Sequence, residues 1–288
     1  MPEVSVVPEG VEPSRWVGAA AAPLAVGDLW LLSWDGTALG LALVSGVAAD
    51  YALVWPVSFV EASYPPALDV PESPLGTPLA VWPTRETGVG LHLFDRRFGP
   101  LLSERTMALI LDAVEAGEEP PLAWVASDLS EEQRELETDA MVDRWEAICL
   151  HTWPNAEVGS SPLSVEALEH VGIGIAELVE VLTLGTPEAV ALYRGELAPS
   201  SDQVNAIAER YGFDANDLIE AGGEARILVA PAYKAEIVET ARLLGIGEGR
   251  ARDLVRSEVA LAARSDGDPA SRVAAAIQRV RLMNDDGV

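Results

Sequence analysis

The residue types that support metal or nucleophilic chemistry are few and scattered in this sequence. The histidines, His92, His151 and His170, share no metal-ligand spacing. Cys149 and His151 supply at most two ligands, fewer than a zinc site needs. The Walker, G-x-S-x-G and H-E-x-x-H patterns of nucleotide, serine and zinc enzymes are absent. We therefore predict no metal and no cofactor, and a core or surface role for each histidine.

Arginines follow a glycine-rich hairpin near the C-terminus. The run Gly245-Ile246-Gly247 looks like a helix-hairpin-helix motif, in which backbone amides approach a phosphate at a helix N-terminus. The cations after it, Arg250, Arg252 and Arg256, are candidate DNA contacts. The alternative, which we favour, is a tight helix connection in which Ile246 plugs the core and the arginines pair with nearby carboxylates.

A turn between two apolar helix faces lies in the middle of the chain. Leu178, Val179 and Leu182 form the first face. Leu184-Gly185-Thr186 then makes a tight turn, with Thr186 as the expected N-cap and Pro187 at the first helical position. This spacing predicts a helix-turn-helix unit.

Short runs after this turn strengthen that interpretation: Arg194-Gly195, Pro199-Ser200, Ile207-Ala208 and Asp217-Leu218-Ile219. Together with the turn, they resemble the Cro/CI-type (XRE-like) helix-turn-helix family. The resemblance implies a five-helix fold in which residues 186–194 form the recognition helix. Thr186, Glu188 and Arg194 would then be DNA contacts.

The charge of this unit departs from what DNA binding requires. A recognition helix should present Arg, Lys, Gln or Asn to base edges, and its surroundings should meet phosphates with positive charge. This one presents Pro187, Glu188 and Ala191, with Arg194 alone, and residues 160–225 hold 12 acidic against 2 basic residues. We therefore favour a helical interaction module over a DNA-reading one.

Short apolar runs separated by turn formers fill residues 27–94. Their Val, Leu, Trp and Tyr content predicts five or six strands in a small closed or nearly closed barrel. Pro56 and Pro83 would then lie at strand ends, edges or bulges.

The order of four runs in this region resembles the MazF/PemK toxin family, a small SH3-like barrel: Gly27–Trp30, Leu41–Ser45, Val54–Ser58 and Phe98–Ser103. That family cleaves RNA with an Arg near the second strand and a Thr or Ser after the third. The Arg position falls here on Gly40 or Leu41, so that the Arg is missing, whereas Ser58 can supply the hydroxyl. Arg85 is the nearest spare cation in sequence. Ser58 and Arg85 are thus the candidate catalytic residues, and we favour a barrel retained for binding.

Capping signals predict one helix that closes the barrel domain and a second helix between that domain and the middle unit. Ser103 and Thr106 begin an apolar stripe that runs to Gly117, and Ser130 with Gln133 makes a capping box for a helix through about Leu150. We expect an extended arm at 1–25, the barrel at 26–117, a linker and helix at 118–162, the helix-turn-helix unit at 163–223, and a C-terminal helical region at 224–288. The predicted class is α+β, an N-terminal small SH3-like β-barrel followed by an all-α region that contains the helix-turn-helix.

The charge balance limits the classes of partner that the chain can bind. Asp and Glu number 46 against 19 Lys and Arg, a net charge of -27, which repels nucleic acids and anionic lipid surfaces. Only residues 226–288, with 9 acidic and 10 basic residues, escape this imbalance. The lone Cys149 is typical of a reducing compartment, acidic residues replace the basic start of a signal peptide, and no uncharged stretch is long enough for a membrane helix. We predict a cytoplasmic protein without a membrane partner.

These observations favour a bacterial regulatory or interaction protein, of the transcription-regulator or toxin–antitoxin type, over an enzyme. A protein partner is expected, DNA is the second candidate partner, and a homodimer is considered because both resembled families are commonly dimeric. One alternative is a MazF-like endoribonuclease toxin that uses Ser58. Another is an acidic protein that mimics nucleic acid and so occupies a basic partner.

Overall fold

The computed structural model divides the chain into two compact units. It describes residues 3–19, 23–48, 51–60, 63–153, 163–194, 197, 199–213, 218, 227–262 and 269–282. Unit 1 comprises Met1–Thr152, Leu228–Glu258 and Ala274–Val288, and unit 2 comprises Trp153–Ile227 and Val259–Val273. Contacts thus group most of the C-terminal helices with the N-terminal part of the chain, whereas the sequence suggested a separate region at 224–288.

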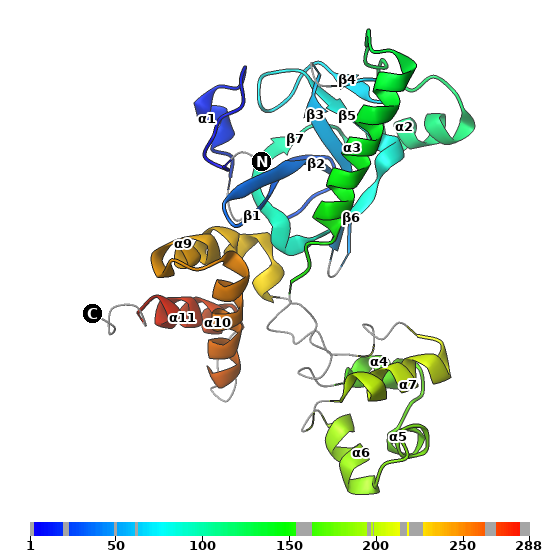
Figure 1. The fold of residues 1–288 in the computed structure, drawn as a ribbon, viewed down its shortest axis with the longest axis vertical. Coiled ribbons are helices and arrows are strands. Elements are labelled where there is room, and N and C mark those ends of the chain that lie inside the picture. Colours follow the sequence, from blue (N-terminus) through cyan, green and yellow to red (C-terminus); the bar gives the residue numbers. More distant parts are fainter. Residues whose placement is uncertain are drawn as a thin grey trace. The chain divides into compact units, whose positions relative to one another are not determined.

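Unit 1 is built on a seven-stranded antiparallel sheet (Figure 1). Its strands are β1 (Asp28–Trp34), β2 (Thr37–Val47), β3 (Tyr51–Phe59), β4 (Leu68–Val70), β5 (Leu79–Val81), β6 (Thr87–Gly90) and β7 (Phe94–Pro100). The strand order is β4-β5-β3-β2-β1-β7, and β6 also pairs with β3. Among the described residues β4 and β7 do not pair, so the sheet is not closed. The α+β class is confirmed, and the closed form of the predicted barrel is not observed.

Pro56 lies inside β3 and not at a strand end, an edge or a bulge, which corrects the prediction from sequence. It faces Ala42 of β2, while on the other side of β3 the partner changes from β6 at Val54 to β5 at Val57. Pro56 falls between the residues of β3 that pair with β6 and those that pair with β5. A proline fits there because no hydrogen bond between strands needs the backbone N–H that proline lacks. Pro83, by contrast, begins the short 3-10 helix η2 (Pro83–Arg85) directly after β5, at a strand end as predicted.

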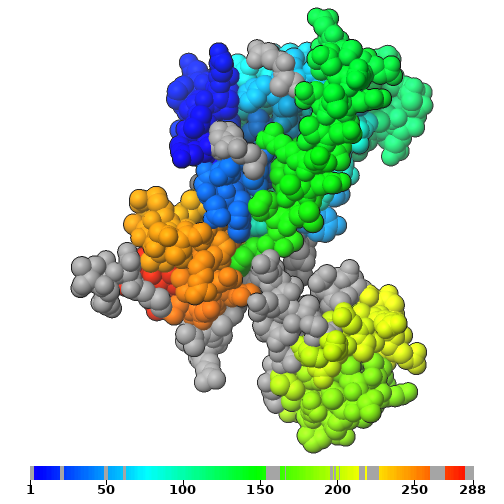
Figure 2. Space-filling view, viewed as in Figure 1, coloured from blue at the N-terminus to red at the C-terminus, as the bar shows by residue number. Residues whose placement is uncertain are grey.

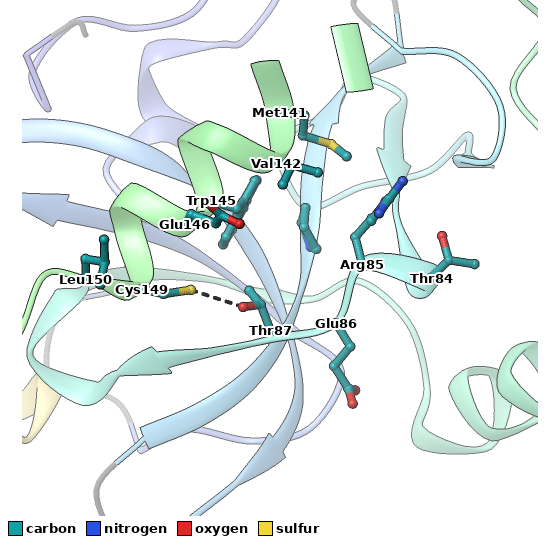
Figure 3. Close-up of a pocket in the computed structure, with 11 residues that line it drawn as sticks. Thr84, Arg85, Glu86, Thr87, Met141, Val142, Trp145, Glu146, Cys149 and Leu150 are labelled. Atoms are coloured by element: carbon teal, nitrogen blue, oxygen red, sulfur yellow. Dashed lines mark hydrogen bonds between the residues drawn. The ribbon is translucent and has the colours of Figure 1, made fainter. Parts of the chain in front are cut away.

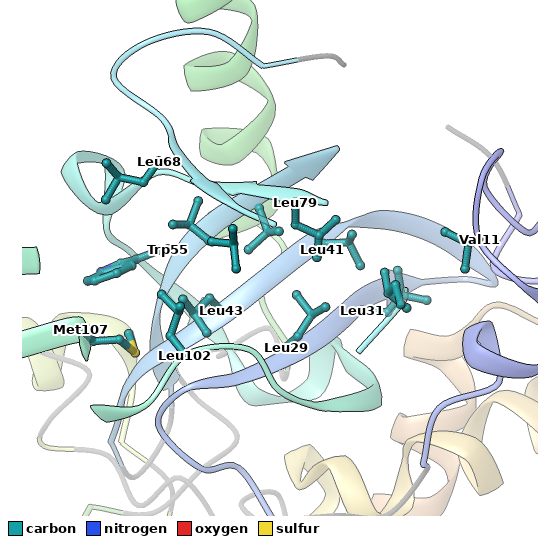
Figure 4. Packing of buried hydrophobic residues seen from close by; sticks show 14 of the residues in the cluster. Val11, Leu29, Leu31, Leu41, Leu43, Trp55, Leu68, Leu79, Leu102 and Met107 are labelled. Carbon is teal, nitrogen blue, oxygen red and sulfur yellow. The ribbon is translucent and has the colours of Figure 1, made fainter. Parts of the chain in front are cut away.

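Each face of the sheet has its own apolar core, because side chains alternate along a strand. One core takes Leu29 and Leu31 of β1, and α2 (Glu104–Ala116) covers it with Met107 and Ile110 (Figure 4). The other core takes Trp30 and Leu32 of β1, together with Trp145 and Ile148 of α3 (Glu131–Cys149). The sheet is thus covered by helix α2 on one side and by helix α3 on the other.

Both covering helices begin at the predicted caps. The backbone N–H of Thr106 donates to Ser103 Oγ at 3.1 Å, and α2 ends at Gly117 with a φ of +67°. Ser130 and Gln133 form the predicted capping box, since Ser130 N donates to Gln133 Oε1 at 3.0 Å and Gln133 N donates to Ser130 Oγ at 3.3 Å. Local capping chemistry therefore places α3 along the sheet.

The N-terminal arm is packed against the sheet. It contains a short helix, α1 (Pro13–Trp16), and not only the extended chain that was expected. Trp16 is 5% exposed, its indole N–H donates to the Val4 carbonyl at 3.0 Å, and its ring stacks on Phe98 at 5.1 Å. Burial of one large indole, worth about 2 kcal/mol or more, thus holds the arm beside β7.

The C-terminal helices follow a short 3-10 helix, η5 (Pro231–Tyr233), and are α9 (Lys234–Leu244), α10 (Glu248–Ala262) and α11 (Pro269–Leu282). Arg281 near the end of α11 donates from Nε to Thr240 Oγ1 at 2.9 Å and from Nη2 to the Glu236 carbonyl at 2.9 Å, both on α9. Arg279 pairs with Glu258 of α10 at 2.9 Å. Side-chain bonds therefore join the end of α11 to both other helices.

Unit 2 contains α4 (Val165–His170), α5 (Ile175–Leu182), α6 (Thr186–Tyr193) and α7 (Ser201–Tyr211) around a shared apolar cluster that includes Leu178, Leu192 and Ile207. Helix α6 is capped by Gly185, so Thr186 is its first residue and not its N-cap as predicted. Of the runs that resemble the Cro/CI-type family, Gly195, Asp217 and Ile219 lie outside the described residues.

Candidate functional site

Ser58, a candidate catalytic residue, lies on β3 in a chain of hydrogen bonds. Trp82 Nε1 donates to Ser58 Oγ at 3.0 Å, Ser58 Oγ and Ser63 Oγ are 2.7 Å apart, and Ser63 Oγ donates to the Phe59 carbonyl at 2.8 Å. A hydroxyl has one proton, and that of Ser63 is already given to Phe59. Ser58 therefore donates its own proton to Ser63, an arrangement that stabilises the loop after β3.

This arrangement does not place a base beside the Ser58 hydroxyl within the described residues. A serine is activated by a base within hydrogen-bond reach, such as a histidine, a lysine or a carboxylate. In the part of the chain that the structure describes, the hydrogen-bond partners of Ser58 are an indole and a second hydroxyl. Neither accepts a proton readily near neutral pH, so the contacts of Ser58 are those of a structural side chain.

Arg85, the predicted cation, is exposed and lines a different pocket from Ser58. This Arg85 pocket has a volume of about 510 Å³ and lies between α3 and the segment that joins η2 to β6 (Figure 3). Cys149 closes one part of it, with its Sγ 3.0 Å from Thr87 Oγ1. Glu86 accepts a bond from Trp55 Nε1 at 3.2 Å.

Ser58 lines a second pocket, of about 560 Å³, on the β2–β3 surface. The arm and α3 flank this Ser58 pocket, and Figure 2 shows them on either side of the strands. Pro56, Met141 and Trp145 line both pockets. The two predicted catalytic residues therefore line different but adjoining pockets beside α3, and no hydrogen bond joins their side chains in the described part of the chain.

Helix α3 occupies the space where the resemblance to the MazF/PemK family requires an arginine. A Cβ at Gly40 would lie 3.5 Å from Trp145 Cζ2, 3.8 Å from Ile148 Cδ1 and 3.9 Å from Arg144 Nη2. A methyl group fits these distances, but a longer side chain would collide with α3. The glycine is thus explained by the close approach of the helix.

Arg144 on α3 is a cation of this surface that the sequence did not reveal. Its guanidinium donates from Nε to the Leu39 carbonyl at 3.1 Å and from Nη2 to the same oxygen. Burial lowers the pKa of Arg144. No local pattern marks it, because its partner carbonyl lies on β2, more than one hundred residues earlier in the chain.

The helix that follows the predicted hairpin at Gly245-Ile246-Gly247 points its N-terminus at a carboxylate of the same chain, that of Asp35. The backbone N–H of Glu248 donates to Asp35 Oδ1, in the turn between β1 and β2. A Cβ at Gly247 would lie 3.3 Å from the same oxygen, and one at Gly249 would lie 3.3 Å from Trp34 Cζ2. The place that a phosphate would take at this helix N-terminus is therefore filled by Asp35.

The three arginines after the hairpin differ in position. Arg252 is fully buried and bonds Glu248 through Nε at 3.0 Å and Nη2 at 2.8 Å, so its guanidinium does not reach the surface. This placement corrects the expectation that Arg252 contacts DNA. Arg256 is half-buried and 3.4 Å from Asp253, whereas Arg250 is exposed. DNA contact by Arg250 and Arg256 stays a prediction.

A buried ionic cluster, composed of Lys234, Glu248 and Arg252, joins the C-terminal helices to the sheet. Lys234 Nζ is 2.7 and 2.8 Å from the two carboxylate oxygens of Glu248, and also donates to the Ser33 carbonyl at 2.9 Å and to the His92 carbonyl at 3.2 Å. Burial lowers the pKa of Lys234 to about 8, although Glu248 opposes this effect.

His92 lies beside this buried ionic cluster. Burial, helped by the nearby charges of Arg252 and Lys234, lowers the pKa of His92 to about 3. A neutral imidazole is therefore held among cations, where it contributes to packing. In the described part of the chain no group of three His, Cys, Asp or Glu side chains is arranged to hold a metal ion.

Helix α6, the predicted recognition helix, has few side chains on its outer face that could contact DNA. Thr186, Pro187, Glu188 and Arg194 are exposed, whereas Leu192 is buried in the core of unit 2. The predicted contacts Thr186, Glu188 and Arg194 are thus accessible on one helix and its end. A single cation on this face offers DNA one phosphate contact.

Comparison of the chain with protein-family models, curated proteins and solved structures gave no match. None of the described helices combines the length and the apolar composition needed to cross a bilayer.

Proposed function

We propose that the chain is a non-enzymatic regulatory protein that binds a protein partner through the outer face of α6. The main observation that supports this proposal is that the face is exposed at Thr186, Pro187 and Glu188 and bears one cation, Arg194. A face of this kind suits a partner with neutral or basic side chains. It does not suit a polyphosphate.

The charge around α6 supports a protein partner over DNA. Sequence-independent DNA affinity comes from several cations that each replace a counterion on a phosphate. Residues 160–225 hold only two basic residues, Arg194 and Arg210, against 12 acidic ones. The Arg210 guanidinium lies 5.9 Å from the centre of the Tyr211 ring, on α7. A phosphate backbone near this unit would meet more repulsion than attraction.

For unit 1 we propose a cytoplasmic SH3-like barrel, open between β4 and β7, that binds a ligand and does not cleave RNA. The hydrogen bonds of Ser58 support this choice, since they give its proton to Ser63 and leave it without a base. The separation of Ser58 and Arg85 into two pockets supports it as well. These two observations favour a binding role over RNA cleavage.

The partner can be tested by placing a photo-crosslinking amino acid at Glu188 of the full chain in its native host. We expect one discrete protein adduct, which the same amino acid at exposed Glu169 of α4 does not give. With the purified partner, Glu188→Lys should weaken binding at least about tenfold, a change of about 1.4 kcal/mol, and Glu169→Lys should not. Equal adducts or equal affinities at both positions would refute the role of α6.

DNA binding is tested separately by gel shifts with genomic fragments across a salt series. We expect no specific shift even at low salt. A specific shift that Arg194→Ala abolishes would overturn the proposal in favour of a repressor. A shift lost only in an Arg250→Ala, Arg256→Ala double variant would point to the C-terminal hairpin.

A further inference from the structure

The Ser58 pocket has features of a small-molecule site, and they do not depend on α6 or its partner. Its volume of about 560 Å³ lies in the range usual for small ligands. The floor comes from β2 and β3, one wall from the arm and the other from α3 (Figure 2). All three parts belong to unit 1.

Most of the polar atoms in this lining are already used by the fold. The indole N–H of Trp16 bonds the Val4 carbonyl, and that of Trp82 bonds Ser58. Tyr64 packs against Trp82 with 4.8 Å between ring centres. Apart from the buried Tyr64 hydroxyl, which has no hydrogen-bond partner among the described residues, these side chains present mainly carbon edges to the pocket. This lining favours a flat or branched apolar body.

Arg144 differs from these side chains, because it is charged and forms no ion pair within the described part of the chain. Its hydrogen bonds in the described residues go to one carbonyl, that of Leu39. Burial is the cause that lowers its pKa, and no carboxylate opposes the effect. Arg144 is exposed and lines the pocket, so an anion that enters can reach its guanidinium and form the charge-assisted hydrogen bonds that arginine makes with a carboxylate.

Glu137 limits which anion can enter. It lines the same pocket from the same helix, seven residues before Arg144, which is two turns or about 10 Å along α3. A ligand with one carboxylate can place it on Arg144 and keep its apolar body near Glu137. A phosphate ester or a nucleic acid would bring further negative charge toward Glu137.

We propose that the Ser58 pocket binds a small monocarboxylic acid with an aromatic or branched apolar body, and that Arg144 pairs with its carboxylate. The body lies among the carbon edges of Trp16, Tyr64 and Trp82. Ser58 takes no part in recognition beyond holding Trp82 in place.

The test uses calorimetric titration of the full chain with phenylpropionate and indoleacetate, and with their neutral amides. Each acid should bind at least about tenfold more tightly than its amide, since a bond between two charged groups is stronger than one to a neutral group. Arg144→Gln should remove this preference. The control Arg105→Gln, at an exposed arginine of α2, should leave it unchanged.

Arg144→Gln also removes the hydrogen bonds from Arg144 to the Leu39 carbonyl, so a second pair of variants tests the pocket without changing Arg144. Ala140 lines the pocket, so Ala140→Phe should block both acids, whereas Ala147→Phe, exposed on α3 and outside both pocket linings, should not. Equal binding of acid and amide, a preference that survives Arg144→Gln, or no binding of either acid up to about 5 mM would each overturn the proposal.

Discussion

Replacing Glu248 by glutamine should destabilise unit 1 severely, because Glu248 is the anion in the buried ionic cluster between two cations. Its carboxylate contacts Lys234 at 2.7 and 2.8 Å and Arg252 at 2.8 and 3.0 Å. All three side chains are at most 1% exposed. Glutamine keeps an acceptor but leaves two positive charges uncompensated away from water. Removing one member of a buried pair costs about 3–5 kcal/mol, and we expect a loss of that size.

The assay is urea unfolding followed by tryptophan fluorescence. Every tryptophan except Trp153 lies in residues 1–152, so the signal reports mainly on unit 1. Trp34 is a local probe, because its ring lies 5.3 Å from Lys234 Nζ and 6.0 Å from Arg252 Cζ. Glu239→Gln is the matched control. It breaks an ion pair with Arg242 on the surface of α9, and should leave the transition unchanged.

Two further measurements separate charge compensation from simple packing. Glu248→Gln should lower the pKa of Lys234 below its present value of about 8, since Glu248 now raises it. The difference in free energy of unfolding between the variant and the native protein should therefore shrink as the pH rises from about 6 to about 8.5. Over this range Lys234 of the folded variant loses its proton, and with it the uncompensated charge. The double variant Lys234→Met, Glu248→Gln should recover part of the loss. A deficit no larger than that of Glu239→Gln, or a double variant less stable than the single one, would refute the reasoning.

Two more predictions concern unit 1. The pKa of His92 is about 3 in the fold against 6.5 for an ordinary histidine, so the unfolded chain binds a proton first and stability is lost as the pH falls from about 6.5 to about 3. In acid-unfolding curves, His92→Gln should reduce this loss by about 3–5 kcal/mol, and an unchanged pH dependence would contradict the burial of a neutral ring. Ser58→Ala should leave the Trp82 N–H without its acceptor and destabilise unit 1 by about 1–2 kcal/mol in urea, while mixed RNA stays uncleaved by both proteins. Metal-independent cleavage that this substitution abolishes would instead establish the enzyme.

The parts of the fold that the sequence predicted well are those governed by neighbours in the chain. Ser103, Ser130 and Gln133 signal helix starts through bonds that span three residues, and both helices begin there. The number of strands was harder to predict. β4 and β5 have three residues each, which is too short for an alternating pattern. They are strands because β3 pairs with β5 and β5 with β4.

The errors arise where distant segments decide the environment. Pro56 is tolerated inside β3 because β6 and β5 meet on that side, which no local pattern shows. Arg252 is four residues from Glu248, a spacing visible in the sequence, but its burial depends on the carbonyls of Leu228 and His92. The sequence could therefore suggest the ion pair without revealing that it is buried.

Some of the cations of this chain are committed to the fold, and this limits their role in binding nucleic acid. Arg97 is bonded to Asp28 at 2.6 and 2.8 Å, and Lys234 and Arg252 are buried on a shared carboxylate. None of these can release several counterions from a phosphate backbone without giving up bonds within the fold. The 46 acidic residues outnumber all 19 cations, so a polyanion would meet more repulsion than attraction. Contact with DNA would thus require positive charge from a partner, and the same scarcity makes the unpaired Arg144 a better receptor for one small anion than for a polymer.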